Sequence, residues 1–163
     1  MLTAKTRKVR LLPVGEHEFV LTNVSIRGRK PFGTTDKNAV EEAYRWEYSL
    51  AEEIDAGIPD PFILFRSTGM NYGSENATLT QDLKAITGIS SLGESDVERL
   101  PLERLRGLRV MIFITHNRKP DGTTANQVKN IRRASDEPIN LSEFLLPPDE
   151  LPAAAPGGKG KPA

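Results

Sequence analysis

Apolar and polar residues alternate along much of this chain, in short runs that are typical of β-strands. In the first run His17, Phe19 and Leu21 share one face, and the apolar phase then slips to Val24 and Ile26. Such a slip predicts a β-bulge that bends the strand. Further runs of the same kind follow, and the sequence predicts strands over residues 17–26, 44–51, 62–68, 108–115 and 125–133.

The segment between the third and fourth predicted strands has helical periodicity instead. Its apolar stripe consists of Leu79, Leu83 and Ile86. Thr78 and Gln81 have the spacing of a capping box, which predicts the start of the helix. Gly88 follows the stripe where a glycine commonly ends a helix. We therefore expect one helix of about three turns here.

The predicted order is three strands, one helix and two strands. This is the order of an OB-fold, a five-stranded Greek-key barrel, so we expect an all-β domain with one helix between strands three and four. The third strand is apolar on both faces, which predicts a central place in the sheet. In the fifth strand, Val128 and Ile131 face inward together only if a second bulge intervenes.

Composition narrows the class of protein. The chain has 163 residues and no cysteine, which excludes disulfides and cysteine-based zinc sites and favours a reducing compartment. The longest apolar stretch, residues 108–114, is interrupted by Arg109 and is too short to cross a bilayer. The basic start lacks an apolar run of signal-peptide length. We expect a soluble, cytoplasmic protein that makes no membrane contact.

Three segments differ in composition. Residues 1–10 form a basic arm, and residues 11–134 contain all the predicted strands and the helix. From residue 135 to 163 the chain first mixes acidic and apolar residues and then becomes rich in glycine, proline and lysine. We expect an arm, an OB-fold domain and a flexible tail in that order.

Charge is segregated although the formal net charge is zero. Basic residues gather in the loop after the first strand and in residues 116–119, the two loops that flank the ligand face of an OB-fold. Local potential steers a polyanion more than net charge does, although exposed loops also collect lysine and arginine for solubility. The candidate nucleic-acid-binding residues are Arg27, Arg29, Lys30, Phe32, Arg45, Trp46, Tyr72, His116, Arg118, Lys119, Arg132 and Arg133.

Aromatic residues leave two alternatives open. Tyr44, Trp46 and Tyr48 share one face of the second strand, and alternation does not say whether this row fills the core or stacks on bases. If the row is core, Arg45 faces the ligand; if it is exposed, Trp46 is the leading stacking residue. Tyr72 lies in a loop flanked by glycine, where we expect an exposed ring.

Several short motifs are shared with a known family. They are Pro13-x-Gly15-x-His17-x-Phe19, Tyr44-Arg45-Trp46-Glu47-Tyr48, Leu83-x-x-Ile86-x-Gly88-Ile89 and Leu105-Arg106-Gly107-Leu108-Arg109-Val110. Over roughly residues 11–134 the chain resembles the phage-type single-strand-binding proteins, small OB-fold proteins encoded beside replication and recombination genes. The resemblance implies single-stranded DNA binding.

No catalytic constellation, phosphate-binding loop or metal-ligand spacing is visible, so we expect no enzyme activity and no cofactor. The expected function is binding of single-stranded DNA with little sequence preference, in support of replication or recombination. RNA as ligand and a homo-oligomeric state stay open. The alternative is a non-enzymatic interaction subunit of a larger nucleoprotein assembly, which binds a protein partner through residues 138–151. The same segment also has the composition to pack on the barrel.

Overall fold

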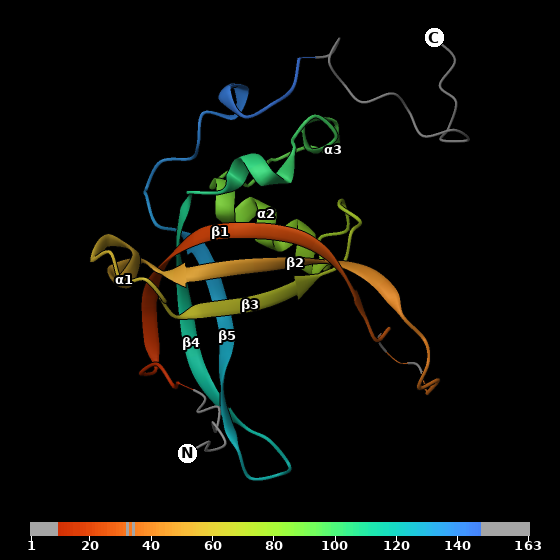
Figure 1. Ribbon diagram of the computed structural model, residues 1–163. Coiled ribbons are helices and arrows are strands. Elements are labelled where there is room, and N and C mark those ends of the chain that lie inside the picture. The colour runs from red at the N-terminus through yellow and green to blue at the C-terminus, as the bar shows by residue number, and fades with distance from the viewer. Residues whose placement is uncertain (1–9, 32, 34, 148–163) are drawn as a thin grey trace.

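The computed structural model describes residues 10–31, 33 and 35–147, and these form a mostly β structure around one antiparallel sheet (Figure 1). The strands are β1 (Gly15–Arg29), β2 (Glu41–Leu50), β3 (Ile63–Thr68), β4 (Arg109–Arg118) and β5 (Thr124–Arg133). Their order in the sheet is β3-β2-β1-β4-β5. The predicted β-rich class and all five strands are therefore confirmed, with β1 and β2 extending further toward their connecting loop than expected.

Short helices accompany the sheet. They are α1 (Ala51–Asp55), α2 (Thr78–Thr87), α3 (Glu94–Val97) and the 3-10 turns η1 (Leu102–Leu105) and η2 (Leu141–Glu143). In Figure 1, α2 and α3 lie at the top, and α1 lies at the left, where it connects β2 to β3. The helix predicted from the stripe of Leu79, Leu83 and Ile86 is α2, the longest of them. No helix in the described part of the chain is long and apolar enough to cross a membrane.

Both predicted bulges are present. In the β1–β2 ladder the register shifts between Leu21 and Asn23, and the extra residue Thr22 donates its hydroxyl to the Glu47 carbonyl at 3.0 Å. In the β4–β5 ladder the register shifts after Phe113, which leaves Lys129 unpaired. A bulge reverses the alternation of side chains along a strand. In β1, Phe19 and Leu21 before the bulge and Val24 after it therefore face the same core.

The third strand does not lie at the centre of the sheet. β3 is at one end of the strand order, next to β2 alone, and β5 is at the other end. Leu64 and Thr68 are buried, whereas Ile63 is 37% exposed and Phe65 is 50% exposed. The outer side chains that suggested a central strand, Ile63 and Phe65, are therefore exposed at the edge of the sheet. Exposed apolar surface of this kind can mark a binding site.

The aromatic row of β2 belongs to the core. Trp46 and Tyr48 are fully buried, and the Trp46 indole N–H donates to the Thr68 hydroxyl at 2.8 Å. They pack with Phe19, Leu83, Ile86 and Ile112 into one apolar cluster between sheet and helix α2. This corrects the candidate role of Trp46, because a fully buried indole has no face on which a base can stack.

Of the two ends predicted for helix α2, only the C-terminal one is confirmed. Ala77 precedes it and no side chain caps it, so the predicted capping box is wrong; Gln81 instead donates to the Glu75 carbonyl at 3.2 Å. Gly88 ends the helix with φ of +75°, as its position predicted, because a left-handed residue there is easiest for glycine. Arg66 of β3 binds Asp82 through two contacts of 2.6 and 3.1 Å, which ties the edge strand to the helix.

Residues 135–147 are packed on the domain and do not form the flexible tail predicted from residue 135. Ile139 is 8% exposed, and its N–H donates to the Thr87 carbonyl at the end of α2. Leu146 and Arg99 bind each other through their backbones and through the Arg99 side chain. The domain therefore extends to residue 147. Most of the segment proposed for partner binding is engaged with its own domain, and residues 148–151 of it lie outside the described residues.

Candidate nucleic-acid interface

The outer face of β1, β2 and β3 brings together residues that are distant in the sequence. Ser25 of β1, Arg45 of β2 and Ser67 of β3 lie side by side in register, as do Asn23, Glu47 and Phe65. Side chains alternate along a strand, and Trp46 points into the core, so its neighbours Arg45 and Glu47 face outward. A shallow hollow of about 280 Å³ is lined there by Arg27, Gly28, Arg29, Arg45, Phe65, Arg66 and Ser67.

Arg45 and Phe65 form the centre of this surface. The Arg45 guanidinium carbon lies 4.1 Å from the centroid of the Phe65 ring, which is a cation–π contact. Phe65 lies on the edge strand β3 and is 50% exposed. The surface thus presents an accessible aromatic face beside a fixed positive charge.

The two arginines of β1 differ in their contacts. Arg29 donates to a Glu41 carboxylate oxygen at 2.9 Å and to the Ser67 hydroxyl at 3.3 Å. Arg29 therefore connects the loop end of the β1–β2 ladder to β3. Arg27 is exposed, and no residue in 10–31, 33 or 35–147 forms an ion pair or hydrogen bond with its guanidinium. Arg27 is therefore a cation of this face that is available to an external anion.

Acidic residues near the face are mostly engaged. Glu41 is bound by Arg29, and Glu47 accepts a hydrogen bond of 2.8 Å from the Asn23 side-chain amide. Lys30, at the end of the β1–β2 hairpin, is exposed. The positive charge of Arg27, Lys30 and Arg45 is therefore only partly balanced on this surface, which favours an anionic ligand.

The β4–β5 hairpin supplies some of the predicted cations, and its histidine makes a hydrogen bond. Arg118 and Lys119 are exposed at its tip, where the Lys119 N–H donates to the Thr123 carbonyl. His116 is bonded through Nε2 to the Leu12 carbonyl at 2.6 Å. Through Nε2 the ring anchors the segment that leads into β1. His116 is nevertheless exposed, and its contact with base edges stays a prediction.

Three other predicted residues are engaged elsewhere. The Tyr72 hydroxyl donates to the Leu92 carbonyl at 2.6 Å, and its ring packs against the core, where burial raises the pKa of the phenol. Arg132 binds both carboxylate oxygens of Glu16, at 2.7 and 3.0 Å. Arg133 donates to the Glu137 carbonyl at 2.7 Å. The expectation of an exposed Tyr72 ring is wrong, and the two arginines lie on β5, away from the hollow lined by Arg27, Arg45 and Phe65.

Phe65 is not among the candidate residues predicted from the sequence. A signal was available, because Ile63, Phe65 and Ser67 fall on one side of β3 and Leu64 on the other. Two apolar residues on the polar-facing side indicate either a covered strand or a binding surface. Phe32, the predicted stacking residue of the β1–β2 loop, lies outside the described residues.

Titratable groups among the described residues do not gather into a metal centre: no group of three or more histidine or acidic side chains is placed to hold a metal ion within residues 10–31, 33 and 35–147. The chemistry of the face is therefore that of arginine, lysine and one aromatic ring. Compared with family models, with curated proteins and with solved structures, the chain has no match.

Proposed function

We propose that the sheet is an OB-fold barrel and that it binds single-stranded DNA with little sequence preference across the outer face of β1, β2 and β3. The order of the strands and of α2 along the chain supports this fold. In OB-folds the ligand crosses the second and third strands between the β1–β2 and β4–β5 loops. Arg45 and Phe65 lie on those two strands, and Lys30, Arg118 and Lys119 lie at the two hairpins.

One observation supports the proposal most: a half-exposed phenylalanine lies under an arginine, next to a second arginine that has no partner within the described residues. Every nucleobase has a π face, so stacking on Phe65 tolerates any sequence. Arg27 and Arg45 neutralise phosphates on either side of the stacked base. Side chains suited to reading base edges are scarce, since Asn23 and Ser67 are already hydrogen bonded.

The proposed mechanism includes no reaction on the nucleic acid. Binding replaces counterions on the phosphates with arginine and lysine side chains, and affinity therefore falls as the salt concentration rises. The resemblance to phage-type single-strand-binding proteins supports a role of this kind in replication or recombination. A 2′-hydroxyl is what distinguishes RNA from DNA at such a site, so competition by RNA belongs in the test.

The test is fluorescence anisotropy of a labelled oligothymidine of about 30 nucleotides, longer than the ~4–16 nucleotides that one OB-fold covers. Duplex DNA and single-stranded RNA are the competitors, at low and at physiological salt. We expect salt-sensitive binding that prefers the single strand and that is lost in the double variant Arg27→Glu with Arg45→Glu. Arg106→Glu, which makes half of this change in net charge, is the control, because Arg106 is exposed beside η1, away from this face.

Two results would overturn the proposal. The first is a wild-type chain that fails to bind the oligonucleotide even at low salt. The second is binding by the double variant equal to that of Arg106→Glu, which would place the ligand on a different surface. Circular dichroism of each variant separates a loss of binding from a loss of folding.

A further inference from the structure

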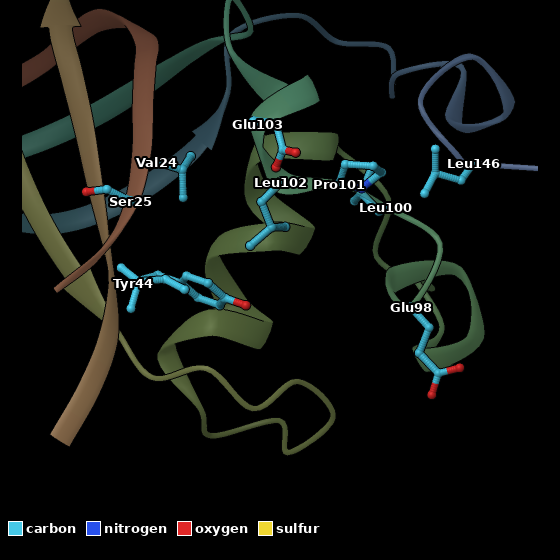
Figure 2. A pocket seen from close by; sticks show the side chains of 10 residues that line it. Val24, Ser25, Tyr44, Glu98, Leu100, Pro101, Leu102, Glu103 and Leu146 are labelled. Carbon is cyan, nitrogen blue, oxygen red and sulfur yellow. The ribbon is translucent and has the colours of Figure 1, made fainter. Parts of the chain in front are cut away.

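A second surface lies on the inner side of the β1–β2 ribbon, where α2 does not cover it. It is a groove of about 640 Å³ between Val24, Ile26 and Tyr44 on one wall and Leu100, Leu102 and Leu146 on the other. Figure 2 shows Val24 and Tyr44 facing the Leu100–Glu103 segment across this space. Successive residues of a strand point to opposite faces, so this groove and the surface around Arg45 are opposite sides of one ribbon.

The lining of the groove is mainly apolar and accessible. Ile26 is 52% exposed, and Tyr44 is only partly buried. The volume falls within the range of about 300–1,000 Å³ that is usual for ligand pockets. An accessible apolar surface of this kind, walled by polar residues, is typical of a site where another molecule docks.

The wall opposite the strands is held in place by its own hydrogen bonds. Leu146 donates its N–H to the Arg99 carbonyl at 2.7 Å and accepts from the Arg99 guanidinium at 2.9 Å. Arg104 donates to the Phe144 carbonyl at 3.2 Å. The groove is therefore formed before any ligand arrives, which lowers the entropic cost of binding.

Two carboxylates give the groove a charge preference. Glu98 and Glu103 line it on either side of the apolar segment Leu100–Leu102. Neither carboxylate forms an ion pair or hydrogen bond within the part of the chain that the structure describes, whereas nearby Arg99 and Arg104 are bound to backbone carbonyls. A ligand that places a cation at each end of an apolar anchor would complement both carboxylates.

We propose that this groove is the docking site of a partner protein's peptide segment, in which an apolar side chain is flanked by lysine or arginine. Nucleic acid is a poorer occupant, because its phosphates would meet the Glu98 and Glu103 carboxylates. This site is independent of the proposed DNA-binding face, and it gives the chain a means of binding a protein and a single strand at once.

The probe is a labelled peptide of alternating leucine and lysine, about ten residues long, with a leucine–glutamate peptide of the same length as its counterpart. Anisotropy is measured with the full chain. We expect the lysine peptide to bind the wild-type chain and unlabelled oligothymidine not to displace it. The double variant Glu98→Lys with Glu103→Lys should bind the lysine peptide at least about tenfold more weakly and prefer the glutamate peptide.

The matched control is Asp60→Lys with Glu75→Lys, which makes the same change in net charge at exposed positions outside the groove. Equal weakening in this control would show a non-specific charge effect and overturn the proposal. So would a wild-type chain that binds neither peptide. Light scattering tests whether a second copy of the chain fills the groove instead. A wild-type dimer that becomes monomeric in the Glu98→Lys, Glu103→Lys variant would show this and overturn the proposal. Loss of peptide binding with DNA binding retained would leave the proposed function intact.

Discussion

Replacement of Phe65 by alanine tests how the proposed interface holds a single strand. The ring is half exposed and lies 4.1 Å from the Arg45 guanidinium carbon. If a base stacks on it, alanine removes the stacking surface and leaves every charge of the face in place. The variant should therefore lower affinity without changing the salt dependence of binding, because no phosphate contact is lost.

The magnitude follows from burial and from stacking energies. A phenylalanine that buries half of its roughly 200 Å² loses about 100 Å² on truncation, or about 2.5 kcal/mol at ~25 cal/mol per Å². That cost lies below the ~5–15 kcal/mol of a typical domain, so the variant should stay folded. A base stacked on an aromatic ring contributes about 1–3 kcal/mol, which corresponds to a loss of affinity of about 5- to 150-fold.

The assay is anisotropy with oligothymidine over a series of salt concentrations, with unfolding in urea measured in parallel. Phe65→Leu keeps most of the apolar volume but has no π face, so it should bind as weakly as Phe65→Ala. Ile58→Ala is the matched control, since Ile58 is 44% exposed in the turn between α1 and β3. Wild-type affinity in either Phe65 variant, or an equal loss in Ile58→Ala, would refute stacking on this ring.

Two further predictions concern the domain that holds the interface. Asp82→Ala removes the ion-pair partner of the Arg66 side chain, which is only 24% exposed. It should lower the free energy of unfolding in urea by about 3–5 kcal/mol. Adding Arg66→Met should recover most of that loss, and no recovery would contradict the ion-pair argument. The pKa of Glu53 lies below its ordinary value of 4.5 because Arg10 and then the Phe62 N–H bind its carboxylate. Its stabilising contribution is therefore present above the unfolded pKa and is lost as pH falls below 4.5 through the folded pKa. Glu53→Gln should flatten this part of the acid-unfolding curve, and an unchanged slope by circular dichroism would contradict it.

Much of the fold was predictable because its signals are local. Alternation of apolar residues marks a strand wherever it lies, and a slip of phase records a bulge within a few residues, as at Thr22 and Lys129. Gly88 was equally predictable, since a left-handed helix end favours glycine by its own backbone sterics. The start of α2 was not, because a capping-box spacing is a weak signal that many non-capping segments share.

The candidate interface was only partly predictable, because exposure depends on partners that are distant in the chain. Arg132 is bound by Glu16, 116 positions earlier, and His116 by the Leu12 carbonyl, 104 positions earlier. Composition alone does not distinguish Arg132 and His116 from Arg27, which is exposed and has no partner among the described residues. Arg45 was correctly placed on the outer face under one of the two alternatives for the aromatic row, and its contact with Phe65 was not foreseen.

The order of strands and helix, the bulges and the two faces of each strand can be read from local sequence, because side-chain periodicity and backbone sterics act over a few residues. The folded domain was needed to show which face of β2 is core, that β3 is an edge strand, and that residues 139–146 pack on their own domain. These outcomes depend on which apolar surfaces bury one another most completely. That is a property of the assembled sheet and helices, and no single segment of the chain contains it.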